Sequence, residues 1–256
     1  MSFTNIIKSL FDKKKTKVIL EKIFIRFFDD KGSLNQEDLE NWLKENESEL
    51  SSFCKKQSGA LWRKSLKISK KIESFSKQKL SKIKIDLGGG GAYPLLIFLT
   101  LKYKPKNIVE TGVGAGFSSY AFLEGIKENR LGKLYSSDFP YFRVSGAEKF
   151  IGYLVPNHLR KNWHLYTEGD QKNLKKILKN IKKINLFHYD SDKSYYGRRR
   201  TLNKIKFYLD RKSWIVMDDV QNNSYFFDLI NEEKKRYWKI FNFKGKWVGV
   251  ICPKKI

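Results

Sequence analysis

Acidic residues stand at the carboxyl end of each of five predicted β-strands. They are Glu110, Asp138, Glu168 with Asp170, Asp190 with Asp192, and Asp218 with Asp219. Residues 86–256 contain 16 carboxylates against 32 lysines and arginines, and eight of the 16 lie at these five ends. A solvated surface would scatter them. Because parallel α/β sheets bind ligands outside the carboxyl ends of their strands, this placement indicates a binding site there.

A glycine-rich turn follows the first of these strands, in the stretch Glu110-Thr-Gly-Val-Gly-Ala-Gly116. Gly112, Gly114 and Gly116 permit positive φ and let the backbone approach a ligand closely. The third glycine of the dinucleotide pattern G-x-G-x-x-G would fall at Phe117, and no P-loop Gly-Lys-Ser/Thr occurs. The remaining pattern, E-x-G-x-G-x-G, is typical of S-adenosylmethionine (SAM) binding.

SAM carries an amine, a ribose diol and a sulfonium, so acidic partners suit it. Asp138 is expected to accept both ribose hydroxyls, as the acid after the second strand does in Rossmann sites. Glu110 could face the methionine ammonium, and Asp170 could accept from the adenine amine. The alternative for Asp138 and Asp170 is a turn or a helix cap. The predicted cofactor contacts are Glu110, Thr111, Gly112, Gly114, Gly116, Ser118, Asp138 and Asp170.

A metal site is predicted from Asp190, Asp218 and Asp219, which neighbouring strands should bring together. Carboxylates held this close raise one another's pKa unless a cation joins them. Three carboxylates suit Mg²⁺, or else Mn²⁺ or Ca²⁺, and such an ion could activate a substrate hydroxyl. Asp192 could then accept the proton, with Asp190 as the second catalytic residue. The alternative is that Asp192, Asp218 and Asp219 cap the following helices, and Lys193 and His188 are weaker candidates.

The elements that would position these residues alternate along the chain. Strands are predicted at 107–111, 133–137, 163–167, 184–189 and 213–217, and helices at 118–130, 145–155, 171–182, 195–210 and 223–236. Two further strands, 240–243 and 247–252, flank the turn Lys244-Gly-Lys246 and should form a hairpin. Such alternation predicts an α/β fold with a Rossmann-like, seven-stranded, mostly parallel sheet and a terminal antiparallel hairpin.

Residues 1–85 are predicted to form a helical extension, and residues 86–256 the catalytic domain. Helices are expected at 17–28, from 34 or 35 to 50, and at 52–81, with Ser33 and Gln36 at capping-box spacing. The extension could pack on the main domain, contact a second subunit in a homo-oligomer, or lie on a membrane surface. The glycine run Gly88–Gly91 is either a linker or a loop over the cofactor.

Composition narrows the setting of the protein. The 256 residues carry a formal net charge of +25, which allows a nucleic-acid partner or reflects a lysine-rich solvated surface. No apolar run reaches the roughly 20 residues of a membrane helix, and the N-terminus lacks a signal-peptide core. Cys54 and Cys252 stand far apart, which fits a reducing compartment. A cytoplasmic protein without a transmembrane segment is expected.

Together, Glu110–Gly116, Asp138, Asp190-Ser-Asp192 and Met217-Asp-Asp219 resemble the class I SAM-dependent methyltransferases over about residues 86–256. The resemblance leans towards small-molecule O-methyltransferases of the macrocin type, which act on sugars. It implies a divalent metal on the fourth- and fifth-strand aspartates and a nearby aspartate base. Many relatives have Asp-Gly-Asp-His after the fourth strand, whereas this chain has Asp190-Ser-Asp-Lys193. The Asn/Asp-Pro-Pro-Tyr motif of many N-methyltransferases is missing, which favours a hydroxyl acceptor.

Overall fold

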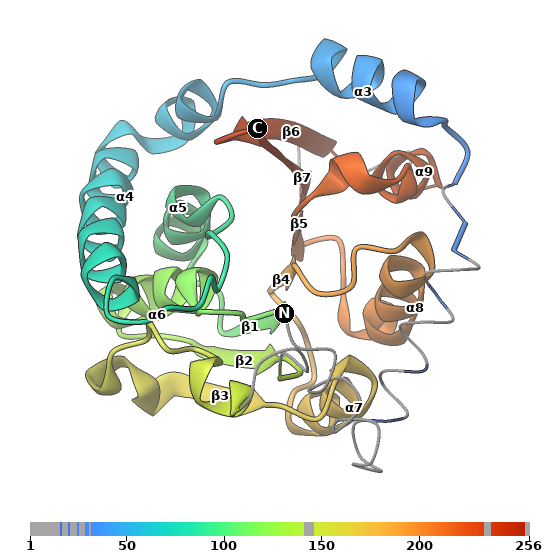
Figure 1. The fold of residues 1–256 in the computed structure, drawn as a ribbon. Helices are drawn as coiled ribbons and strands as arrows, with labels where there is room; N and C mark the ends of the chain where they lie inside the picture. Colours follow the sequence, from blue (N-terminus) through green and yellow to red (C-terminus); the bar gives the residue numbers. More distant parts are fainter. Residues whose placement is uncertain are drawn as a thin grey trace.

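The computed structural model describes residues 32–140, 146–232 and 237–253, together with Thr16, Leu20, Ile25, Asp29 and Asp30. Within these residues one seven-stranded sheet runs through the middle of the molecule, in the order β3-β2-β1-β4-β5-β7-β6 (Figure 1). The strands are β1 (Asn107–Thr111), β2 (Lys133–Ser137), β3 (Trp163–Tyr166), β4 (Leu186–Tyr189), β5 (Trp214–Met217), β6 (Tyr237–Phe243) and β7 (Lys246–Cys252). The predicted Rossmann-like architecture is confirmed.

The five parallel strands end level with one another. Thr111 of β1 lies opposite Ser137 of β2 and Tyr189 of β4, and Tyr189 lies opposite Met217 of β5. The acid that follows each strand therefore emerges at the same edge of the sheet. The strand order reverses beside β1, which is where ligands bind in open α/β sheets.

The terminal hairpin forms as predicted and closes the sheet. β7 pairs antiparallel with both β5 and β6. Lys244 and Gly245 make the turn with φ values of 54° and 81°. Positive φ at both central residues matches the right-handed twist of the two strands, which explains why a glycine stands at the second position.

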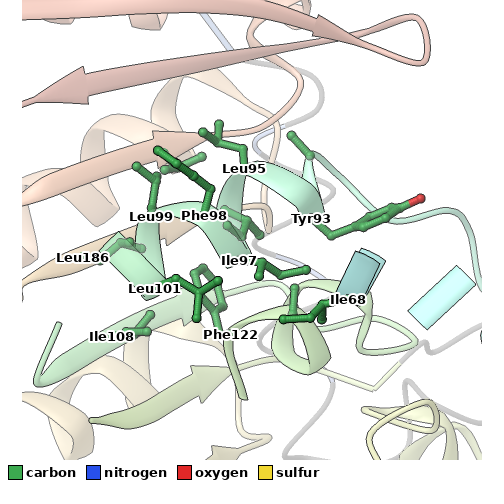
Figure 2. Close-up of a cluster of buried hydrophobic side chains, with 14 of the residues drawn as sticks. Ile68, Tyr93, Leu95, Ile97, Phe98, Leu99, Leu101, Ile108, Phe122 and Leu186 are labelled. Atoms are coloured by element: carbon green, nitrogen blue, oxygen red, sulfur yellow. The ribbon is translucent and has the colours of Figure 1, made fainter. Parts of the chain in front are cut away.

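Helices cover both faces of the sheet. Figure 1 shows α4, α5 and α6 on one face and α7, α8 and α9 on the other, with α3 beside α9. Their bounds are α3 (Gln36–Glu45), α4 (Leu50–Leu80), α5 (Tyr93–Tyr103), α6 (Phe117–Asn129), α7 (Asp170–Asn180), α8 (Tyr195–Ile205) and α9 (Tyr225–Glu232). On the first face, Leu95, Phe98 and Leu99 of α5 belong to one buried cluster with Ile68 of α4 and Phe122 of α6 (Figure 2). These side chains are buried, so hydrophobic burial fixes the sheet that carries the site.

The helices α3 and α4 belong to the same two cores as the sheet. Leu43 of α3 is fully buried with β4 and β5, and Trp62 of α4 packs with α5. Between them, the Ser48 N–H donates to the Ile240 carbonyl at 2.8 Å and covers the edge strand β6. The division of the chain at residue 85 stays a prediction, and most of the predicted helix 17–28 lies outside the described residues.

Two sequence predictions need correction. Asn35, and not Ser33, caps α3, because its side chain accepts from the Asp38 N–H. Residues 145–155 do not form an α-helix where they are described: a short 3₁₀ turn (Ala147–Phe150) is followed by turns. Gly146 and Gly152 have φ values of 62° and 66°, and such positive φ is incompatible with an α-helix. No helix in the described part of the chain has the length and apolar character that crossing a bilayer demands.

Candidate active site

A cavity of about 740 Å³ opens at the carboxyl edge of the sheet, where the strand order reverses. Residues of the β1 turn, the ends of β2 and β4 and the starts of α7 and α8 line it. The predicted site residues on its wall are Gly112, Gly114, Ser118, Asp138, Asp170, Asp190, Asp192 and Asp219. The fold thus brings most of the predicted site to one cavity.

The glycine turn is shaped by close backbone approach. A Cβ on Gly112, whose φ is +83°, would lie 2.3 Å from the carbonyl oxygen of Asp190. Only glycine lets β1 turn away beside the end of β4. Gly116, which was also predicted to contact the cofactor, is the N-cap of α6, and a Cβ there would lie 2.9 Å from Cα of Gly152. Gly116 therefore fixes packing, while Gly112 and Gly114 form the cavity wall.

Asp138 links the end of β2 to the glycine turn. Its Oδ2 accepts from the N–H groups of Val113 at 3.1 Å and Gly114 at 2.8 Å, and its Oδ1 accepts from Phe139 N–H at 2.6 Å. Burial raises the pKa of Asp138 to about 6, although these hydrogen bonds act in the opposite direction. The carboxylate therefore orders the turn and borders the cavity at the same time.

Asp170 lines the cavity as the first residue of α7. Its Oδ1 accepts from Ser137 Oγ at 2.5 Å, so it is tied to the end of β2. The next-turn residue Asn173 donates to the Ser137 Oγ and to the Tyr166 and Asp138 carbonyls at 2.9–3.0 Å. The β2 and β3 ends are thereby held together beneath the cavity.

Glu110 and Thr111 do not reach the cavity wall in the described structure. Both are fully buried. Glu110 Oε2 accepts from Ser119 Oγ at 2.5 Å and from Ser136 Oγ at 2.8 Å. Glu110 therefore lies behind the glycine turn, where it supports α6 and β2.

A buried ionic chain runs under the cavity across three strands. His188 on β4 lies between Glu110 Oε1, 3.6 Å from its Nδ1, and Asp218 Oδ2, 3.5 Å from its Nε2. Burial disfavours the charged imidazole, but the two carboxylates outweigh it and raise the pKa of His188 to about 10. The two carboxylates thus favour the protonated imidazole, although neither ring nitrogen has a hydrogen-bond partner among the described residues.

The three predicted metal ligands, Asp190, Asp218 and Asp219, do not surround an open coordination site. Asp218 is only 3% exposed and is paired with His188. Asp190 and Asp219 do meet, but the Lys193 ammonium lies between them: it contacts Asp190 and is 3.1 Å from Asp219 Oδ2. Within residues 32–140, 146–232 and 237–253, no three His, Cys, Asp or Glu side chains are arranged to hold a metal.

Burial and charge compete in this cluster: burial raises the pKa of Asp190 to about 6, although Lys193 acts in the opposite direction. Burial opposes the charge of Lys193, but Asp190 and Asp219 outweigh burial and raise the pKa of the amine. Burial likewise acts against the Asp219 carboxylate, and Lys193 lowers the pKa of that group overall. Lys193 is therefore a cation under ordinary conditions. The sequence analysis had named Lys193 only as a weaker candidate for the site.

Asp192 takes part in capping α8, which was the structural alternative predicted for it. Ser194 accepts from Gly197 N–H at 2.9 Å, and Asp192 Oδ1 accepts from Ser194 N–H at 3.0 Å. Asp29 adds a cap from the N-terminal region, because its two oxygens accept from Tyr195 and Tyr196 N–H at 3.0 Å each. Asp192 thus has a structural contact and also lines the cavity.

Buried Arg198 holds the loop after β5. It donates to the carbonyl oxygens of Asp218 at 3.2 Å and Asp219 at 2.7 Å. Asp219 has a left-handed backbone with φ of 54°, which turns its side chain to the cavity. Arg198 therefore has a structural role, whereas Arg200, two residues later, lines the cavity.

Sequence reasoning left the role of the glycine run Gly88–Gly91 open, and all four residues line the cavity. A Cβ on Gly91 would lie 1.9 Å from Asp218 Oδ2, so glycine is needed where this loop crosses the end of β5. Lys204 also lines the cavity and donates to Gln171 Oε1 at 2.9 Å. Helix-face residues of this kind give no local sequence signal, because only the packing of α7 against α8 brings them to the site.

Comparison with known proteins agrees with this geometry. Residues 109–220 match the family model described as a methyltransferase domain. The fold is similar to an O-methyltransferase from Bacillus cereus in complex with SAH, with a TM-score of 0.54 and 14% identity over 71% of this chain and 90% of that chain. It is also similar to an SAH-bound methyltransferase from Podospora anserina, with a TM-score of 0.51 and 16% identity over 88% of this chain and 100% of that one. No curated protein sequence matches the chain. The chain therefore has a methyltransferase fold, with a methyltransferase domain matched over residues 109–220.

Proposed function

We propose that this protein transfers a methyl group from SAM to a hydroxyl of a small molecule. The observation that carries the proposal is the cavity at the strand-order reversal, walled by the Gly112–Gly114 backbone and by Asp138. SAM is the cofactor that suits these groups. The glycine turn lets the protein backbone approach the methionine part of SAM closely, and the Asp138 carboxylate can accept hydrogen bonds from the ribose diol. The methyltransferase-domain match and the SAH-bound neighbours support the same cofactor.

The transfer needs a positioned oxygen and a proton acceptor. The acceptor oxygen forms a bond to the methyl carbon, the carbon–sulfur bond breaks, and its electron pair stays on sulfur to give neutral SAH. The hydroxyl proton passes to a carboxylate, for which we propose Asp192, since it lines the cavity. Asp190 would hold the acceptor site together through Lys193. Proximity and orientation supply much of the acceleration in such a displacement.

The resemblance of the sequence to macrocin-type enzymes and the name of the Bacillus cereus neighbour favour oxygen as the acceptor atom, and a sugar or another natural-product-like molecule as its carrier. A cavity of about 740 Å³ lies within the range of small-molecule sites and suits a cofactor with a modest acceptor. The acceptor is proposed to be small for this reason. A cytoplasmic location and a homo-oligomer formed through residues 1–85 stay predictions.

Isothermal calorimetry with SAM and SAH tests the cofactor directly. We expect one binding event per chain with the wild-type protein and much weaker binding for Asp138→Asn, which keeps the volume of the side chain but removes the negative charge that accepts the ribose hydroxyls. Lys64→Gln, on the outer face of α4, is the control. A further alternative to catalysis is a non-catalytic SAM-binding or membrane-surface scaffold that uses residues 1–85. Absence of SAM binding to the folded wild type would refute the methyltransferase proposal and favour the membrane-surface form of this alternative.

The second candidate is a nucleic-acid methyltransferase, and the net charge of +25 motivates it. The two readings differ in their response to salt. Nucleic-acid binding releases counterions and weakens steeply between low and physiological salt. Transfer of radiolabelled methyl to RNA or DNA, with strongly salt-dependent binding, would favour this candidate over a small hydroxylated acceptor.

A further inference from the structure

We propose that the ammonium of Lys193 takes the place of the divalent cation, so that methyl transfer by this protein does not depend on a metal. This inference rests on the proposed function for its chemical meaning. The structural part, a lysine seated between Asp190 and Asp219, stands on its own contacts. It also differs from the sequence-based prediction, in which three aspartates formed a Mg²⁺ site.

The seat is built from two strand ends and a loop. Asp190 directly follows β4, Asp219 follows β5, and Lys193 lies in the loop from β4 to α8. The backbone on both sides of the lysine is fixed, because Asn223 Nδ2 donates to the Lys193 carbonyl at 2.7 Å and Ser194 caps α8. Asp190 is fixed through its N–H, which donates to the Thr111 carbonyl at 2.8 Å. The fold therefore holds the backbone that carries the ammonium, and the two ion pairs place the ammonium between Asp190 and Asp219.

A divalent ion does not fit this donor set. Mg²⁺ requires near-octahedral oxygen ligands, and an ammonium offers no lone pair and repels a second cation. The third predicted ligand, Asp218, is buried beneath the pair with its Oδ2 3.5 Å from His188 Nε2, and its Oδ1 has no hydrogen-bond partner among the described residues. Lys193 is 28% exposed and Asp190 30% exposed, so the pair faces the cavity while remaining largely desolvated.

The lysine can perform part of the work expected of a metal. An ammonium has three N–H donors, and Lys193 directs two of them to Asp190 and Asp219. The remaining donor can reach an acceptor oxygen in the cavity that Lys193 lines. A fixed positive charge there stabilises the oxygen as it loses its proton, and a preorganised donor in a water-poor site is effective in this role. Lys193 would then act on the acceptor directly.

Binding of Mn²⁺, followed by electron paramagnetic resonance of the free ion, tests the seat without any turnover. We expect wild-type protein to take up no Mn²⁺ at this site. Lys193→Met should gain one site, because it leaves Asp190 and Asp219 facing each other without a counter-ion. The matched control is Lys246→Met, which removes a lysine 3.9 Å from Asp219 Oδ1 but leaves Lys193 in place, and it should bind as little Mn²⁺ as wild type.

Two results would overturn the inference. One is Mn²⁺ uptake by wild type that disappears in Asp190→Asn. The other is a folded Lys193→Met that gains no site. The wild-type measurement decides the question even if Lys193→Met does not fold. SAM calorimetry on the same samples tests the proposed function separately. A protein that binds SAM but fails the Mn²⁺ test refutes the role of Lys193 and leaves the proposed function standing.

Once a methyl acceptor has been identified, turnover measurements test the proposed chemical role of Lys193. We expect wild-type kcat to survive exhaustive EDTA treatment and Lys193→Met to lower kcat by about 100- to 1,000-fold, the usual loss when one preorganised donor is removed. The KM for SAM should change little. A loss of wild-type turnover in EDTA that Mg²⁺ restores would refute the role of Lys193.

Discussion

Asp138 is the residue whose ionisation should be visible in cofactor binding. Its pKa is raised to about 6 by burial, and only the carboxylate can accept from both ribose hydroxyls. We therefore expect the affinity for SAM to be constant above about pH 7 and to fall as the pH drops below about 6, approaching tenfold per pH unit. Calorimetry across this range measures it. A wild-type affinity that stays level down to pH 5 would contradict the assignment, and Asp138→Asn should show no such dependence.

Gly112 allows a direct measurement of close backbone approach. Gly112→Ala adds a Cβ 2.3 Å from the Asp190 carbonyl oxygen at φ of +83°. Gly245→Ala is the matched control, because its φ is +81° and nothing lies within 4 Å of the added atom. We expect Gly245→Ala to cost about 1 kcal/mol of unfolding free energy and Gly112→Ala about 1–3 kcal/mol more, as measured by urea unfolding. Equal losses would show that the contact between Gly112 and the Asp190 carbonyl tolerates a Cβ.

The ends of β1, β4 and β5 are coupled through the ionic chain Glu110–His188–Asp218. The folded-state pKa of His188, about 10, lies above its ordinary value of 6.5, so the folded protein holds this proton more tightly than the unfolded chain. The contribution to stability is complete below about pH 6.5 and is lost as the pH rises through about 10. These three strands should therefore weaken under mildly alkaline conditions.

We expect the free energy of unfolding to fall between about pH 7 and pH 10, and His188→Gln to remove most of that slope. Urea unfolding at several pH values measures this. His164→Gln is the control, because burial lowers the pKa of His164 on β3 and this residue cannot contribute in that range. A slope that persists unchanged in His188→Gln would show that the imidazole is neutral in the folded protein.

Two large hydrophobic cores share the one sheet, and α4 contributes to the first and α3 to the second (Figure 1). Leu43 of α3 is fully buried, so Leu43→Ala should cost about 2–5 kcal/mol. We expect this loss in one cooperative transition seen both by circular dichroism and by tryptophan fluorescence. Leu66→Ala, at a position that is 38% exposed, should cost much less. An early separate transition in Leu43→Ala would instead favour an N-terminal unit that unfolds alone.

Much of the fold could be predicted from the sequence because its signals are local. The alternation of apolar strands with helix-length segments predicted all seven strands, and the Lys244–Gly245 turn predicted the hairpin. Errors came where local signals conflict. Residues 145–155 have a helix-like composition, but Gly146 and Gly152 adopt positive φ. Asn35 replaced Ser33 as a cap because either side chain can accept a backbone N–H.

The candidate site was partly predictable for the same reason. Acids that follow parallel strands must emerge at one edge, so Asp138, Asp170, Asp190 and Asp219 were correctly expected to gather there. Asp218 is next to the cavity-lining Asp219 and Glu110 is two residues before Gly112, yet both carboxylates face the buried His188. Sequence order does not reveal which side of a strand end a side chain takes when loops cross it.

The sheet, the glycine turn and the sheet edge where the acidic residues gather could all be predicted from the sequence, because periodicity and residue type act over a few neighbouring residues. The tertiary structure alone decided what lies between the acids. Asp190 and Asp219 come from different strands, and whether a metal or a lysine can sit between them depends on the path of the loop that carries Lys193. Long-range packing fixes that path, because Asn223 and the start of α8 hold the loop in place.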